Sequence, residues 1–117
     1  MADSASSARV FAAPAVSLSA MVPVFNEEAV LPLFYAWIRA VLDGMRLPSW
    51  ELIFINDGSR DRTLDGLRAL AAADPVHVRY LSLSRNFGHQ IAVSAGLDVT
   101  RGEVVAIIDA DLQDPRS

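Results

Sequence analysis

Residues 104–115 read VVAIIDADLQDP, an apolar run that leads directly into three acids and an amide. The run from Val104 to Ile108 is rich in β-branched residues and bounded by polar ones, which predicts a buried strand. Asp109, Asp111 and Gln113 alternate along the chain. An extended backbone would therefore project them to one side, roughly 7 Å from one to the next. The pattern predicts a group of oxygen ligands at the end of a strand.

Oxygen ligands grouped on one side suit a hard divalent cation such as Mg²⁺ or Mn²⁺. Such a cation usually completes its shell with water and substrate phosphate. We therefore expect Asp109, Asp111 and Gln113 to hold a metal–diphosphate. The alternative is a solvated acidic loop, but the position directly after an apolar strand favours the metal site.

The composition bounds the class of protein. The chain has 117 residues, enough for one small domain, and is 52% hydrophobic with six Gly and six Pro. Its net charge of −4 argues against nucleic acid as the main partner. The absence of Cys excludes disulfides and thiolate metal sites. No apolar run reaches the ~18 residues of a membrane span.

Strand and helix patterns alternate along the chain. Apolar runs predict strands over residues 16–22, 50–55, 76–83 and 104–108. Helices are expected between them, one after Asn26, one from Asp61 or Thr63 to about Ala73, and one over residues 88–99. This order predicts an α/β fold with a Rossmann-like parallel sheet, helices on both faces and the strand order 3-2-1-4.

The first helix has two readings at its start. Asn26 could cap a helix whose first turn holds Glu27 and Glu28, or the helix proper could begin near Pro32. Apolar residues recur along it at three- and four-residue spacing, which predicts a single buried face formed by Phe34, Trp37, Ile38, Val41, Leu42 and Met45.

Ligands of such sheets bind beyond the carboxyl ends of the strands, where the strand order reverses. The turns at residues 23–28, 56–60 and 109–113 all follow carboxyl ends, so we expect them to converge on one crevice. Asp57 in the second turn could accept a hydrogen bond from a nucleobase ring N–H, or could bond its own turn.

Several residues of the turns have two possible roles. Glu27 either contacts a ligand near the ribose or base, or is a helix-terminal charge, and Phe25 either lies against a nucleotide or belongs to the core. Arg85 follows the third strand and could contact a phosphate, or could be a surface residue. His89 at a helix start is either catalytic or structural, and a lone His at such a position is more often structural.

Common phosphate-binding motifs are absent. The chain contains neither G-x-G-x-x-G nor G-x-x-x-x-G-K-[ST]. It contains no Lys, which counts against an acidic-pocket domain of the response-regulator kind. A non-catalytic nucleotide- or metal-binding module of the same fold stays open as an alternative.

Four motifs occur in a recognisable order. They are VPVFNEE at 22–28, INDGSRDRT at 55–63, LSRNFGHQ at 83–90 and DADLQDP at 109–115. Together they resemble the amino-terminal half of a family 2 glycosyltransferase, and more narrowly the branch of polyprenyl-phosphate sugar transferases. The resemblance covers residues 18–115. Phe25 departs from the Tyr often seen at its position, which loses a hydroxyl but keeps the ring.

The resemblance implies the nucleotide-binding half of a GT-A type domain and a specific chemistry. A sugar would pass from a nucleoside-diphosphate sugar, UDP-linked or possibly GDP-mannose, to a polyprenyl phosphate, with inversion at the sugar carbon. Mg²⁺ or Mn²⁺ would assist. By position, the nucleoside would be framed by Pro23, Phe25, Glu27, Asp57 and Asp109, and Asp109 and Asp111 would be the catalytic acids.

The resemblance also implies features beyond this chain. Residues 16–117 would be the truncated donor-binding part of a longer enzyme at the cytoplasmic face of the membrane. Independently of the resemblance, the small and polar composition of residues 1–15 predicts a disordered tail. Membrane association would come through segments missing from this chain. We expect the fragment alone to be inactive and poorly stable, which a glycosyl-transfer assay with normal turnover would refute.

Overall fold

The computed structural model describes residues 16–110. The predicted tail at residues 1–15, and Asp111 and Gln113, lie outside the described residues. The elements, in chain order, are β1 (Val16–Val24), α2 (Leu31–Gly44), β2 (Trp50–Asn56), α3 (Thr63–Ala73), β3 (Val78–Ser82), α4 (His89–Leu97) and β4 (Gly102–Ile107).

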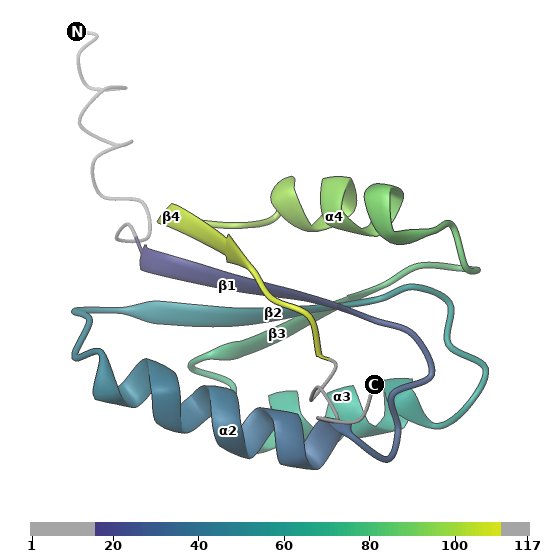
Figure 1. Ribbon diagram of the computed structural model, residues 1–117, viewed down its shortest axis with the longest axis horizontal. Helices are drawn as coiled ribbons and strands as arrows, with labels where there is room; N and C mark the ends of the chain where they lie inside the picture. Colours follow the sequence, from purple (N-terminus) through teal and green to yellow (C-terminus); the bar gives the residue numbers. More distant parts are fainter. Residues whose placement is uncertain (1–15, 111–117) are drawn as a thin grey trace, which may run out of the picture.

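The four strands form one parallel sheet in the order β3-β2-β1-β4, which confirms the predicted topology. Helices α2 and α3 cover one face and α4 covers the other, as Figure 1 shows. The sheet therefore separates two apolar clusters. Right-handed crossovers between parallel strands account for this arrangement.

Strand β2 lies at the centre and is buried along all seven residues. Leu52 and Phe54 face the cluster under α2 and α3, whereas Ile53 and Ile55 face α4. This arrangement agrees with the prediction of helices on both faces of the sheet. Such a strand can be stable only between two layers of helix.

The prediction that Val104–Ile108 forms a buried strand is wrong for part of this run. The side chains of Val104 and Ile107 are 60% and 49% exposed, although Val105 and Ile108 pack against the two clusters. Within the described residues β4 pairs with β1 alone, so one of its edges and part of each face have no neighbour. The apolar run identified a strand but not its position at an edge.

Helix α2 begins at Leu31, with Pro32 in its first turn. The reading in which Asn26 caps the helix is wrong, and the start near Pro32 is confirmed. Asn26 has a positive φ of 53° and lies in the preceding turn. The carbonyl of Glu27 accepts hydrogen bonds from the amides of Val30 and Leu31, which leads the chain into the helix. Strand β1 also runs through Pro23 to Val24, beyond its predicted end.

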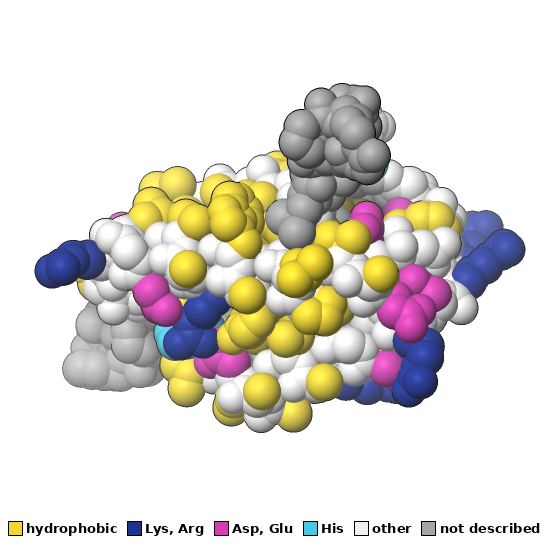
Figure 2. Space-filling model, turned by 60° about the horizontal axis from the view of Figure 1, so that its bottom comes forward, with side chains coloured by type: hydrophobic (Ala, Val, Ile, Leu, Met, Phe, Trp, Pro, Cys, Tyr) yellow, Lys and Arg dark blue, Asp and Glu magenta, His cyan; other side chains and the backbone are white. Residues whose placement is uncertain are grey.

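Helix α2 is apolar on both faces rather than on one. Its inner face is buried and consists of Leu31, Phe34, Ile38 and Leu42. The prediction of one buried face was wrong for the outer residues Trp37, Val41 and Met45, which are exposed together with Leu33. Figure 2 brings the α2–α3 side forward and shows apolar side chains across it. No described helix has the length and apolarity needed to cross a bilayer.

The end of the sheet opposite the strand carboxyl termini is held by a buried carboxylate. Glu51 of β2 accepts hydrogen bonds from the Ser19 hydroxyl, the Arg79 guanidinium at 2.9 Å, and the amide and guanidinium of Arg101 at 2.8 and 3.0 Å. Burial alone would raise the pKa of Glu51, but these bonds outweigh it and its pKa lies below the ordinary value. The carboxylate thus joins β1, β2, β3 and the turn before β4.

Candidate functional site

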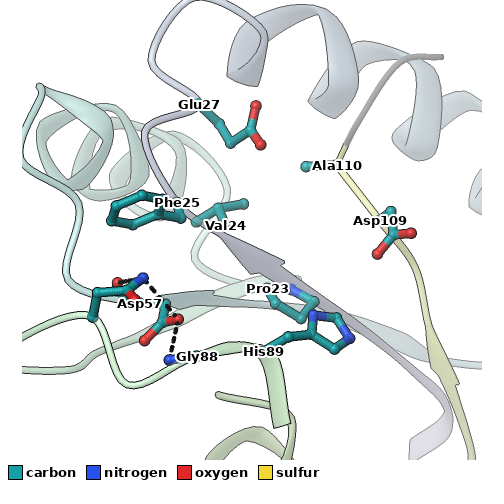
Figure 3. A pocket seen from close by; sticks show the side chains of 10 residues that line it. Pro23, Val24, Phe25, Glu27, Asp57, Gly88, His89, Asp109 and Ala110 are labelled. Carbon is teal, nitrogen blue, oxygen red and sulfur yellow. Dashed lines mark hydrogen bonds between the residues drawn. The ribbon is translucent and has the colours of Figure 1, made fainter. Parts of the chain in front are cut away.

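A pocket of about 460 Å³ opens at the carboxyl ends of β1, β2 and β4. Three acids from three separate turns line it, Glu27, Asp57 and Asp109 (Figure 3). Among residues 16–110, no arginine lines this pocket. We call it the acidic pocket, and its other lining residues are Pro23, Val24, Phe25, Asn86, Gly88, His89 and Ala110. The predicted convergence of the turns is confirmed for residues 16–110.

The β1–α2 turn supplies Phe25 and Glu27 to the pocket. Its backbone is fastened to the turn after β2, because the amide of Asn26 donates to the Ser59 hydroxyl and the amide of Glu27 donates to the Thr63 hydroxyl, both at 2.9 Å. These bonds join positions more than 30 residues apart. They position Phe25 and Glu27 without help from a helix cap.

Asp57 is buried and its carboxylate holds the β3–α4 loop. It accepts hydrogen bonds from the amides of Phe87 at 2.8 Å and Gly88 at 3.0 Å, and from the side-chain amide of Asn86 at 3.1 Å. The alternative in which Asp57 bonds its own turn therefore needs correction, since the bonded backbone lies 30 residues away. An ionised carboxylate has about four acceptor positions, so these three bonds leave about one for a ligand.

Asp109 comes two residues after the end of β4 and lies across the pocket from Asp57 (Figure 3). Its carboxylate is the type of ligand that Mg²⁺ or Mn²⁺ prefers. Residues 16–110 contain no group of three metal-binding side chains. Of the three predicted metal ligands, Asp109 is the one that the structure describes. The other two predicted ligands lie outside the described residues.

The structure places Arg85 away from the acidic pocket. Its guanidinium lies over the Phe87 ring, 4.5 Å from the centroid, and it lines a neighbouring hollow. Among residues 16–110, Arg85 and Asp109 thus do not line the same cavity. The phosphate contact of Arg85 stays a prediction.

Four residues that were not expected to contact a ligand line the pocket. Val24, Asn86, Gly88 and Ala110 each lie within one of the four motifs of the sequence. The run from Asn86 to His89 follows a strand, as the other site turns do, and this was the available signal. His89 lines the pocket from the first residue of α4, and Figure 3 shows its ring beside Pro23.

The parallel sheet with an acidic pocket at its carboxyl edge defines an α/β domain of the GT-A type. The profile of the family described as glycosyl transferase family 2 matches residues 19–117. The chain belongs to this family.

Three known proteins illustrate the likeness. The chain is 48% identical over 100 residues to a bactoprenol glucosyl transferase of Shigella phage SfX, covering 86% of the chain and 32% of that protein. A mannosyltransferase from Pyrobaculum calidifontis in complex with GDP-Man and Mn²⁺ has a TM-score of 0.66 at 24% identity, covering 88% of the chain and 30% of that structure.

The third is the glucosyl-3-phosphoglycerate synthase of Mycobacterium tuberculosis, in complex with Mn²⁺, UDP and glucosyl-3-phosphoglycerate. It has a TM-score of 0.60 at 28% identity and covers 86% of the chain and 35% of that structure. The chain spans about a third of the length of the curated relatives that it matches.

Proposed function

We propose that this chain is the donor-binding part of an enzyme that transfers a sugar from a nucleoside-diphosphate sugar to a polyprenyl phosphate. The observation that carries the proposal is the meeting of Glu27, Asp57 and Asp109 in one pocket of about 460 Å³. A pocket of this size suits a small-molecule ligand. The bactoprenol glucosyl transferase among the relatives supports the polyprenyl acceptor. The UDP complex of the glucosyl-3-phosphoglycerate synthase supports a UDP-sugar, while GDP-mannose, bound by the Pyrobaculum mannosyltransferase, is the other candidate.

In this proposal, different pocket residues contact different parts of the donor. Pro23, Phe25 and Glu27 frame the nucleoside from the β1 side. The remaining acceptor position of Asp57 receives a ring N–H of the base. Asp109, with Asp111 and Gln113, holds the diphosphate end and a divalent cation. Arg85 lines the neighbouring hollow and is not assigned to the donor in this proposal.

The reaction proposed for the intact protein is a displacement at the sugar carbon. An oxygen of the acceptor phosphate forms a bond to that carbon while the bond to the diphosphate breaks, so the configuration inverts. A phosphate acceptor is already ionised near neutral pH, so the chain does not need to supply a strong general base. A bound Mg²⁺ or Mn²⁺ would neutralise charge that develops on the departing nucleoside diphosphate. Such an enzyme would act at the cytoplasmic face of the membrane.

Separate titrations of UDP, GDP and Mn²⁺ test this proposal. We expect nucleoside diphosphate to bind in the presence of Mn²⁺, and binding to be weakened at least about tenfold by Asp109→Asn or Asp111→Ala, since each removes a charged ligand. Asp98→Asn is a matched control on the exposed end of α4. Nucleotide binding that is indifferent to Mn²⁺ and to both variants would instead support a non-catalytic module.

A further inference from the structure

A second hollow, of about 510 Å³, lies beside the acidic pocket and shares Phe25 and Asn86 with it. We call it the basic hollow, and its lining residues are Phe25, Asn26, Gly58, Ser59, Arg60, Ser84, Arg85 and Asn86. Two of these are arginines and none is acidic. The charged side chains that line the two cavities therefore differ in sign: the acidic pocket would need a cation to hold a diphosphate, whereas the basic hollow can hold an anion directly.

The two arginines of the basic hollow have no acidic partner among residues 16–110. Five other arginines pair with a carboxylate within 4 Å, namely Arg39, Arg62, Arg68, Arg79 and Arg101. Arg60 and Arg85 do not, although both line one cavity. Two unpaired like charges that share a cavity are stabilised by an anion between them. The contact with Phe87 also holds the Arg85 guanidinium in place.

The walls of the basic hollow are fixed by contacts between three turns. The amide of Arg60 donates to the Asn26 side-chain oxygen at 2.8 Å, and the amide of Asn26 donates to Ser59. At Gly58 the β3–α4 loop comes so near that an added Cβ would lie 2.1 Å from the backbone carbon of Arg85. The cavity is thus built before any ligand binds, which lowers the cost of binding.

We propose that the basic hollow binds a phosphate group through Arg60 and Arg85, independently of any divalent cation. Guanidinium groups donate several hydrogen bonds to phosphate oxygens, and the hydroxyls of Ser59 and Ser84 are further donors in the lining. The phosphate could belong to a free phosphate compound or to a lipid headgroup. The site goes beyond the proposed donor pocket, which uses neither arginine.

Calorimetric titration of the 117-residue chain with inorganic phosphate, in the presence of a metal chelator, tests the site. We expect binding that Arg60→Gln/Arg85→Gln weakens at least about tenfold, because two charged donors are lost. The matched control is Arg62→Gln/Arg68→Gln, which removes the same charge from arginines outside the hollow. Absence of phosphate binding, or an equal loss in the control, would overturn the proposal.

Ser84→Glu provides a second variant that places a negative charge in the hollow while keeping both arginines. It should also abolish phosphate binding, and unchanged binding would contradict the site. Vesicles with phosphatidic acid, compared with neutral vesicles, distinguish the sources of the phosphate. Binding to the acidic vesicles that requires both arginines identifies a lipid headgroup, and phosphate binding without it identifies a free compound.

The same double variant separates this site from the donor pocket. UDP binding in the presence of Mn²⁺ should be unchanged in Arg60→Gln/Arg85→Gln, because neither arginine lines the acidic pocket. If Asp109→Asn leaves UDP binding intact, the donor proposal fails while the phosphate result is unaffected. Parallel loss of both ligands in the arginine variant would contradict two separate sites.

Discussion

The carboxylate of Asp57 holds three successive residues of the β3–α4 loop at once. Its partners are the amides of Phe87 and Gly88 and the side chain of Asn86. Because this loop borders both cavities, one buried acid fixes part of each. The sequence marked Asp57 as important, but its partners lie 29 to 31 residues further along the chain and have no local signal.

Replacing Asp57 with Asn should loosen this loop. One carboxylate oxygen becomes an NH₂ group that faces a backbone N–H, so at least one charge-assisted bond is lost, at about 1.5–3 kcal/mol. We expect the free energy of unfolding to fall by that amount in urea denaturation, and the amides of Phe87 and Gly88 to exchange faster with deuterium. Asp98→Asn, at an exposed position, is the control. Unchanged exchange at Phe87 and Gly88 would show that Asp57 does not hold the loop.

Gly58 and Gly44 offer a matched pair of substitutions. Gly58 has a φ of 71° and its missing Cβ would meet the Arg85 backbone, whereas a Cβ at Gly44 would meet nothing within 4 Å. Gly58→Ala should lower the free energy of unfolding by at least about 1–2 kcal/mol from backbone strain alone. Gly44→Ala, at the end of α2, should be neutral or stabilising by up to about 1 kcal/mol. Equal effects of the two changes in thermal denaturation would be inconsistent with the close approach at Gly58.

At the scale of elements, the sequence predicts where the strands and helices lie along the chain better than it predicts which of their side chains are buried. The apolar spacing in α2 identified a helix, but it could not separate the residues that face the sheet from those that face outward, since both sides are apolar. The helix start was obscured because Asn26 and Glu27 are held by Ser59 and Thr63 rather than by a cap. Tertiary hydrogen bonds here override a local capping pattern.

The two faces of α2 should respond differently to truncation. Phe34 is fully buried and makes an edge contact with Phe54, whereas Trp37 is 50% exposed. We expect Phe34→Ala to cost about 3–5 kcal/mol in the free energy of unfolding, because a buried aromatic leaves a cavity. Trp37→Ala should cost less than half as much. The measurement is chemical denaturation of both variants, and a larger loss for Trp37→Ala would mean that its outer face is covered in solution.

At the scale of the whole molecule, the predicted α/β sheet, its order and its two helical layers agree with the structure. Strands that are apolar on both faces require two helical layers, and crossovers of one hand leave few strand orders. The exposure of Val104 and Ile107 could not be predicted, because an apolar strand reads the same at an edge as at the centre. The three acids of the pocket could be predicted because each follows the carboxyl end of a strand.

The Glu51 network should make the stability of the whole sheet depend on pH. The folded pKa of Glu51 is lowered, so its contribution is complete above the ordinary value of 4.5 and is lost as the pH falls through the folded pKa. We expect the free energy of unfolding to decline below about pH 4.5. Glu51→Gln should destabilise the chain at pH 7 by about 3 kcal/mol or more, since it leaves Arg79 and Arg101 without their partner.

The control for this experiment is Glu103→Gln, at an exposed position of β4. Glu51→Gln should flatten the decline below pH 4.5 relative to the wild-type chain, whereas Glu103→Gln should leave its shape unchanged. The pKa of Asp74 is also lowered, so the free energy of unfolding of both variants will still decline in part at low pH. An identical pH profile for wild type and Glu51→Gln would show that the network adds nothing to stability.

The central claim is that three turns form one pocket for a nucleoside diphosphate, and amide NMR of the chain titrated with UDP and Mg²⁺ tests it most directly. The account predicts that chemical-shift changes concentrate at Phe25, Asp57, Gly88 and Asp109, while Glu51 and Arg101 at the opposite end of the sheet stay unperturbed. Perturbations confined to one turn, or centred on the Glu51 end, would contradict it.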